Sequence, residues 1–175
     1  MLSQKAYAAE NHVAPSSIKR WYDKGYMPGA ERNDCTGEYK IPADTQMPYH
    51  GKGLEKVTKI PTLMIKLLEA AESAQSVFPS MFPRIAENGF QHTLDELIHG
   101  EKVVLVETEN GAYLHITATG VVLKDELETL SKKDREKLNS AILSAASPLV
   151  VGVILKIIEK VIENSDLIQQ LLQPK

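Results

Sequence analysis

The chain has 175 residues, a length that allows one compact domain or two small ones. With 43% hydrophobic and 25% charged residues, its composition is typical of a globular protein and excludes a disordered or collagen-like chain. The formal net charge of -3 excludes a uniformly basic nucleic-acid coat. The charge is uneven, however: residues 1–53 have seven Lys and Arg against six Asp and Glu, a net +1, and the remainder carries -4.

Cysteine content and hydropathy indicate the compartment. Cys35 is the only cysteine, so no internal disulfide forms, and no basic start leads into an apolar stretch of the kind found in secretory signals. The most apolar stretch, residues 149–162, contains three charged residues and is shorter than the roughly 20 residues that span a bilayer. We therefore expect a cytoplasmic protein without a membrane span.

The first 25 residues predict two short helices. Ser3 is a suitable cap for a helix over residues 4–11, and a turn follows at residues 12–14. Pro15 fits the first position of a second helix, which ends at Gly25. The apolar stripe of this helix, at Ile18, Trp21 and Tyr22, must pack against the first helix and a third element.

Residues 30–41 predict that third element, a small hairpin. The turn-forming residues 34–37 precede residues 38–41, in which polar and apolar residues alternate as in a half-buried strand. Residues 44–53 contain Pro48, Gly51 and Gly53 and show no periodicity, so we interpret them as a linker with a domain boundary near Gly53.

The following residues predict a mixed domain. A helix is expected over residues 54–74, kinked or restarted at Pro61. Thr93 and Glu96 have the spacing of a capping box, which predicts a short helix over residues 94–98. A hairpin is predicted over residues 103–117, with Asn110 and Gly111 as its two-residue turn, and residues 120–123 are a candidate third strand.

Two helices are predicted to complete the chain, one over residues 131–146 and one that begins after Pro148 and ends at about residue 172. In the second, apolar residues recur at alternating spacings of three and four, as in the heptad seam of a coiled coil or bundle. The seam positions are Val151, Ile154, Ile158, Val161, Ser165, Ile168 and Leu172. This pattern slightly favours self-association over a core helix of a monomeric domain. The apolar face is wide at its start, which suits a dimer with several helices per subunit.

Residues 3–44 resemble the winged helix-turn-helix domains of excisionases, which are relatives of the DNA-binding heads of MerR regulators. The resemblance covers about a quarter of the chain. Its informative positions are Ala8-Ala9, Val13, Pro15-Ser16, Ile18, Arg20-Trp21, Gly25, Pro28-Gly29 and Ile41-Pro42-Ala43-Asp44. The expected fold class is therefore α+β, with a winged helix-turn-helix at residues 1–50 and a mixed dimerisation or sensing domain at residues 54–175.

The resemblance implies that the second helix lies in the major groove of double-stranded DNA and that the hairpin is a wing on the flanking backbone. If Ile18, Trp21 and Tyr22 face inward, the rest of the helix presents hydroxyls and cations that bond phosphates and base edges. The expected contacts from the helix are Ser16, Ser17, Lys19, Arg20 and Lys24, and those from the wing are Arg32 and Lys40. Arg20 could contact either DNA or an acidic side chain nearby.

The small charge of residues 1–53 bears on how DNA would be bound. A net +1 neutralises few phosphates, so one copy gains little free energy from counterion release. Two copies joined through the carboxyl-terminal domain would compensate through effective concentration, which predicts a homodimer and a palindromic site. The resulting hypothesis is a transcriptional regulator. The alternatives are an excisionase, a phage DNA-packaging subunit, or a protein-interaction or ligand-binding module.

Enzymatic function is not expected. No Gly-rich phosphate loop, serine nucleophile elbow or paired-cysteine metal motif is present, and Cys35 has no metal-ligand partners nearby in the sequence. On a continuous helix, His92, Glu96 and His99 would share one face and form a conceivable metal site. A helix capped at Thr93 would exclude His92 from that face. We therefore predict no catalytic residues, no metal and no cofactor.

Overall fold

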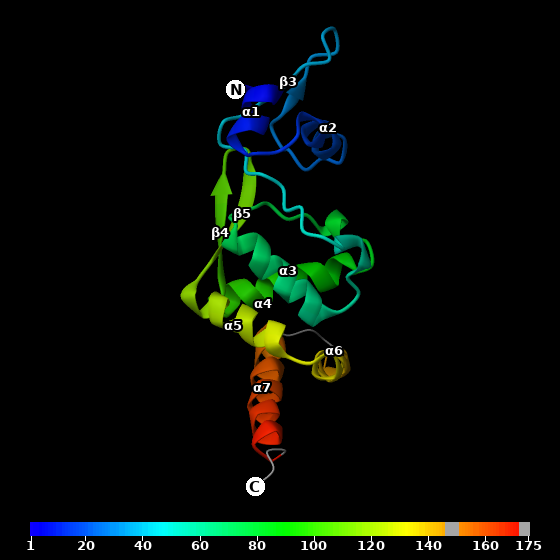
Figure 1. Ribbon diagram of the computed structural model, residues 1–175, viewed down its shortest axis with the longest axis vertical. Helices are drawn as coiled ribbons and strands as arrows, with labels where there is room; N and C mark the ends of the chain where they lie inside the picture. The colour runs from blue at the N-terminus through cyan, green and yellow to red at the C-terminus, as the bar shows by residue number, and fades with distance from the viewer. Residues whose placement is uncertain (146–150, 172–175) are drawn as a thin grey trace.

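The computed structural model describes residues 1–145 and 151–171 (Figure 1). The molecule is elongated, with its amino terminus near one end of the long axis and its carboxyl terminus at the other. Helices predominate, and two small antiparallel sheets accompany them, which confirms the α+β class. Within the described residues, no helix combines the length and apolar composition that a bilayer crossing requires.

We call residues 1–44 the amino-terminal region. Helix α1 (Gln4–Glu10) begins after Ser3, whose Oγ accepts a hydrogen bond from the Ala6 amide at 3.2 Å, as expected of a cap. Helix α2 (Pro15–Asp23) begins at its proline and is followed by Gly25, which has a φ of +72°. The two predicted helices are confirmed.

A three-stranded sheet completes the amino-terminal region. Strands β2 (Glu31–Arg32) and β3 (Tyr39–Ile41) form the predicted hairpin, and β1 (Leu2–Ser3) pairs with the other edge of β3. The side-chain oxygen of Asn33 accepts hydrogen bonds from the amides of Cys35 and Thr36 and shapes the hairpin turn. The sequence did not indicate β1, because two residues are too few to show alternation.

We call residues 45–145 and 151–171 the carboxyl-terminal region. Its first segment, residues 45–53, has neither helix nor strand, as expected, but it packs closely. Pro48 forms an isolated parallel β-bridge with Ser76, and the Tyr49 amide donates a hydrogen bond to the Ser76 carbonyl at 2.8 Å. Tyr49 is buried. The domain limits 1–50 and 54–175 remain predictions.

Helix α3 (Ile60–Glu72) is the centre of the carboxyl-terminal region. A 3-10 turn, η1 (Leu54–Lys56), precedes it, and Pro61 lies in its first turn, so the predicted helix over residues 54–74 does restart there. Helix α3 contacts α4 (Glu87–His99), β5 (Gly111–Ile116), α5 (Ala118–Thr129) and α6 (Lys132–Ala145). Most of its apolar side chains are fully buried. It therefore forms the core to which the other elements attach. A second 3-10 turn, η2 (Pro79–Met81), precedes α4.

The capping box predicted at Thr93 and Glu96 is wrong. Helix α4 begins after Ala86, and Thr93 lies in its middle, where its hydroxyl donates to the Gly89 carbonyl at 2.7 Å. Glu96 is turned toward another helix instead of back to the Thr93 backbone. The predicted helix over residues 94–98 is thus only the last part of a longer one.

The predicted hairpin is β4 (Val103–Thr108) and β5 (Gly111–Ile116), but its turn differs by one residue. Thr108 pairs with Gly111, so Glu109 and Asn110 form the loop, and Gly111 already belongs to the strand. The candidate third strand at residues 120–123 is wrong. Those residues lie in helix α5 (Ala118–Thr129), whose first turn is capped by the Thr117 hydroxyl.

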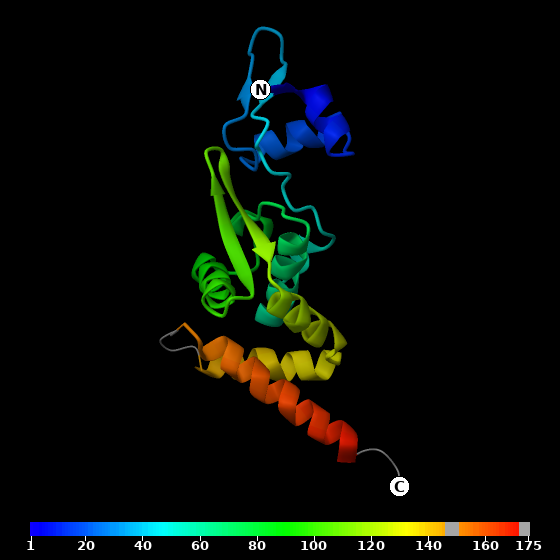
Figure 2. The same cartoon turned by 90° about the vertical axis from the view of Figure 1, so that its left-hand side faces the viewer.

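Helices α6 (Lys132–Ala145) and α7 (Val153–Leu171) confirm the two predicted carboxyl-terminal helices and pack on each other. Figure 2 shows that the far part of α7 extends beyond the other elements. Of the heptad positions, Ile154 and Ile158 are buried, whereas Val151 is exposed. Leu172 lies outside the described residues, and at Ser165 and Ile168 only the helical backbone is described.

Candidate nucleic-acid interface

Helix α2 has one buried and one exposed face. Ile18 and Trp21, which are 0% and 4% exposed, anchor the helix in the core. Ser16, Lys19 and Arg20 follow at spacings of three and four on the opposite, exposed face. Because Ile18 and Trp21 are packed in the core, the exposed polar face of α2 has a fixed orientation. Such a face can present its side chains to a ligand.

The other residues expected to contact DNA from α2 differ in exposure. Ser17 is half-buried, and Lys24 is exposed at the end of the helix. Asp23 shares the face of Lys19 and Arg20 and reduces its positive charge. The ion pairs formed among the described residues involve none of these cations, so Arg20 has no acidic partner there.

The hairpin places its two expected contacts on exposed positions. Arg32 lies directly opposite Tyr39 in the strand register, and its guanidinium carbon is 5.9 Å from the Tyr39 ring centroid. The Tyr39 ring in turn meets the Tyr22 ring edge-on, with centroids 5.1 Å apart. This chain of contacts connects Arg32 to α2 and fixes the wing relative to the helix. Lys40 is exposed and faces Glu31 across the hairpin.

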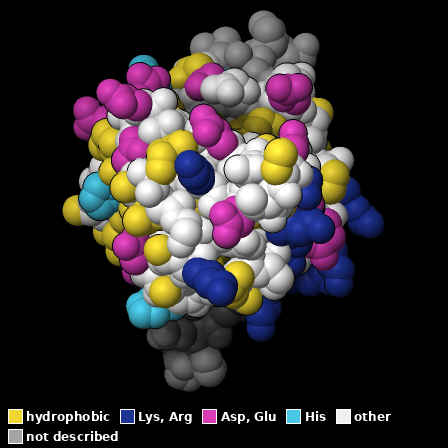
Figure 3. All heavy atoms as spheres, turned by 90° about the horizontal axis from the view of Figure 1, so that it is seen from above, with side chains coloured by type: hydrophobic (Ala, Val, Ile, Leu, Met, Phe, Trp, Pro, Cys, Tyr) yellow, Lys and Arg dark blue, Asp and Glu magenta, His cyan; other side chains and the backbone are white. Residues whose placement is uncertain are grey.

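Cations and acids are mixed on the surface seen from the amino-terminal end of the long axis. Figure 3 shows more Lys and Arg side chains on the right of this view and Asp and Glu side chains on both sides. The positive charge of α2 itself comes from the exposed residues Lys19, Arg20 and Lys24.

Buried and bridging contacts fix the amino-terminal region on the carboxyl-terminal region. The Tyr7 hydroxyl donates to the Thr45 carbonyl at 3.1 Å, and burial raises the pKa of Tyr7 to about 12. At the tip of the β4–β5 hairpin, the side-chain amide of Asn110 donates a hydrogen bond to the Asp44 carboxylate at 2.7 Å. Gly29 lies so close to Asn110 that a β-carbon there would be 2.3 Å from its side-chain oxygen. These contacts could not be predicted from the sequence, because the partners are far apart along the chain.

His92, Glu96 and His99, the candidate metal ligands, do lie on one continuous helix, α4. The Glu96 carboxylate, however, is occupied by other hydrogen bonds. This carboxylate is 0% exposed and accepts hydrogen bonds from the first amides of α7, at 2.7 Å from Gly152 and 3.1 Å from Val153. The Nε2 atom of His92 is 3.5 Å from the same carboxylate. Among the described residues, no group of three or more His, Cys, Asp or Glu side chains is arranged to hold a metal ion.

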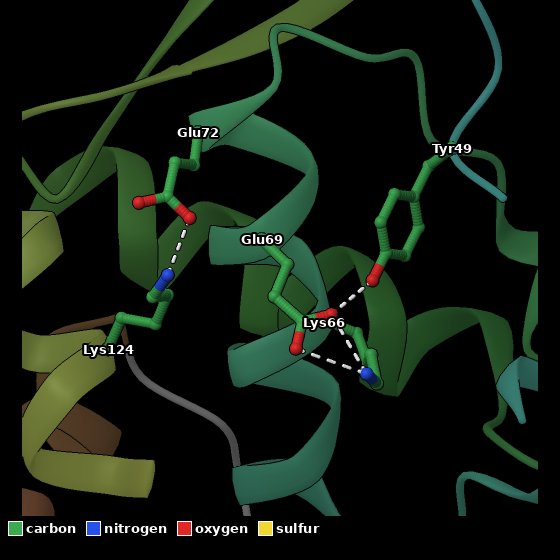
Figure 4. A network of polar contacts seen from close by, with 5 residues as sticks. All are labelled: Tyr49, Lys66, Glu69, Glu72 and Lys124. Atoms are coloured by element: carbon green, nitrogen blue, oxygen red, sulfur yellow. Dashed lines mark hydrogen bonds and ion pairs between the residues drawn. The ribbon is translucent and has the colours of Figure 1, made fainter. Parts of the chain in front are cut away.

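A polar cluster in the carboxyl-terminal region joins Tyr49, Lys66 and Glu69 (Figure 4). The Tyr49 hydroxyl donates a short hydrogen bond to Glu69, and Lys66 donates to both carboxylate oxygens, at 3.1 and 2.8 Å. Burial and the adjacent carboxylate raise the pKa of Tyr49 far above its ordinary value. Such a hydroxyl is a poor base or nucleophile, so this cluster is suited to fastening residues 45–53 to α3.

Comparison with protein-family models, with curated proteins and with solved structures yields no match for this chain.

Proposed function

We propose that this protein binds double-stranded DNA through a winged helix-turn-helix formed by residues 1–44 and acts as a dimeric transcriptional regulator. The main support is the division of α2 into an anchored apolar face and an exposed face with Lys19 and Arg20. A helix of this kind can enter the major groove while its buried side holds it at a fixed angle.

The wing adds to this support. Because Arg32 is tied to α2 through Tyr39 and Tyr22, helix and wing form one rigid surface that would meet groove and backbone together. The proposed contacts are Ser16, Ser17, Lys19, Arg20 and Lys24 from α2, with Arg32 and Lys40 from the wing. The serines and Arg20 would contact base edges or nearby phosphates, and the wing cations would contact the backbone.

Fluorescence anisotropy tests the proposal directly. The protein is titrated into a labelled duplex from its own upstream region and into a scrambled duplex, over a series of salt concentrations. We expect selective binding with a steep salt slope, and each of Lys19→Ala and Arg32→Ala should reduce that slope by about 1 if the residue contacts a phosphate. Lys133→Ala is a matched control, because it removes the same charge from an exposed position on α6. Weak binding that depends on neither sequence nor salt would refute the proposal.

A further inference from the structure

A pocket of about 360 Å³ lies where α2 meets the carboxyl-terminal region. We call it the junction pocket. Arg20 and Lys24 line it from the amino-terminal side, and His50 and Ser80 line it from the carboxyl-terminal region. Its volume is within the range of roughly 300–1,000 Å³ that is common for small-molecule sites.

The lining of the junction pocket is positively charged. Arg20 and Lys24 are outside the ion pairs of the described residues, and Glu55 is the only carboxylate of the pocket lining. A guanidinium forms forked hydrogen bonds to phosphate oxygens, and an ammonium supplies a point charge. His50 and the Ser80 hydroxyl add further hydrogen-bonding groups. The Lys24 ammonium lies 5.9 Å from the centroid of the Tyr26 ring, which also lines the pocket. Two cations without an acidic partner among the described residues are suited to an oxyanion.

Apolar side chains form another part of the lining. Trp21, Leu54, Met81 and Pro83 all contribute to it. The Trp21 and His50 rings lie 6.0 Å apart, centroid to centroid, across the boundary between the two regions. A ligand that fits both parts therefore has a phosphate attached to a compact, ring-bearing body.

We propose that the junction pocket binds the phosphate group of a nucleotide-like ligand. The phosphate would come from a free mononucleotide-sized molecule or from the DNA backbone. A free ligand would occupy Arg20 and Lys24, two of the proposed DNA contacts, and would therefore lower DNA affinity. His50 and Ser80 are outside the proposed DNA-contacting set, so the pocket goes beyond the proposed function and is testable separately.

Trp21 makes the test simple, because it is the only tryptophan and it lines the pocket. Adenosine monophosphate is titrated into the full-length protein, with adenosine as the control that lacks the phosphate, and tryptophan emission and calorimetric heat are both recorded. We expect saturable binding of the monophosphate and none of adenosine at the same concentrations. Arg20→Ala should weaken binding about tenfold or more, and His50→Ala about threefold to tenfold. Lys133→Ala removes an exposed charge on α6, outside the pocket, and should leave binding unchanged.

Duplex binding distinguishes the two sources of the phosphate. If the monophosphate does not bind but His50→Ala weakens duplex binding, the phosphate belongs to the DNA backbone. If the monophosphate binds and His50→Ala leaves duplex affinity unchanged, the ligand is a free molecule. The proposal is wrong if monophosphate and adenosine behave alike and His50→Ala has no effect on duplex affinity. A protein that binds no duplex would refute the proposed function, yet the monophosphate titration would still decide on the pocket.

Discussion

Arg20 and Trp21 are neighbours in the sequence, but they differ in burial. Trp21 is 4% exposed and Arg20 is exposed. Removing a large buried aromatic side chain loses its transfer free energy and leaves a cavity, whereas an exposed side chain without partners contributes little to stability.

The first prediction compares these two residues by urea unfolding. Trp21→Ala should lower the free energy of unfolding by about 3–5 kcal/mol, and Arg20→Ala should change it by less than about 0.5 kcal/mol. Circular dichroism follows the transition, because the Trp21 variant has no tryptophan fluorescence. Equal midpoints for the two variants would show that α2 is oriented differently.

The second prediction concerns the response of Glu69 to pH. Burial alone would raise its pKa, but hydrogen bonds from Lys66 and Tyr49, with the charges of Lys66 and Lys124, lower the pKa below the ordinary 4.5. A carboxyl group with a lowered pKa in the folded state stabilises the protein above its unfolded-state pKa, and that stabilisation is lost as the pH falls. Between about pH 7 and about pH 3.5, wild type should lose more unfolding free energy than Glu69→Gln. Parallel losses in urea titrations would contradict this assignment.

At the scale of elements, the start of α7 depends on a side chain of α4. Glu96 accepts hydrogen bonds from the amide of Gly152, directly before α7, and from those of Val153 and Ile154 in its first turn. The first amides of a helix have no intrahelical acceptor. A carboxylate at this position also interacts favourably with the positive end of the helix dipole. Contact between two helices therefore caps the start of α7.

The third prediction tests this cap. Glu96→Ala leaves several buried amides unsatisfied and should lower the free energy of unfolding by about 2–4 kcal/mol. Glu96→Gln keeps one acceptor oxygen and should cost less. Asp95→Asn, one position earlier on α4, serves as the control, with an effect below about 0.5 kcal/mol. Denaturant unfolding measures all three variants, and an unchanged Glu96→Ala protein would contradict the capping role.

At the scale of the whole molecule, the proposed DNA-binding surface and α7 lie at opposite ends of the long axis. Ile157, Val161 and Ile162 of α7 are only partly buried in one copy, although their apolar side chains favour burial. A second copy packed against α7 would cover them and join two DNA-binding surfaces. Each surface has few cations, so the pair would bind far more tightly than either alone.

The fourth prediction follows from this arrangement. Light scattering should give a mass of twice 19.4 kDa for the wild type, and Val161→Glu should shift it toward the monomer. The same variant should weaken duplex binding by about 100-fold or more, since the avidity of two linked sites is lost. Glu163→Gln alters an exposed residue two positions away and should remain dimeric. A monomeric wild-type protein would exclude this mode of DNA binding.

Local chemistry made much of this fold predictable from the sequence. Ser3, Pro15 and Gly25 mark the limits of the first two helices because caps, fixed φ angles and positive φ act within one turn of the chain. The two faces of α2 follow from helical periodicity alone, so the exposed residues Lys19 and Arg20 were identifiable without a structure. The candidate interface within residues 1–44 was predictable for that reason.

Features that depend on distant partners were not predictable. Glu96 matched a local capping pattern, yet it bonds to amides more than 50 residues away, and α4 extends through Thr93. Residues 120–123 fitted a strand as well as a helix, because the periodicity of a short apolar run does not distinguish the two. Gly120 packs so close to the backbone that a β-carbon would lie 2.0 Å from the Lys102 carbonyl oxygen. The junction pocket likewise depends on distant partners, because tertiary packing brings His50 and Ser80 next to Arg20. The spacing of these residues along the chain does not predict this proximity.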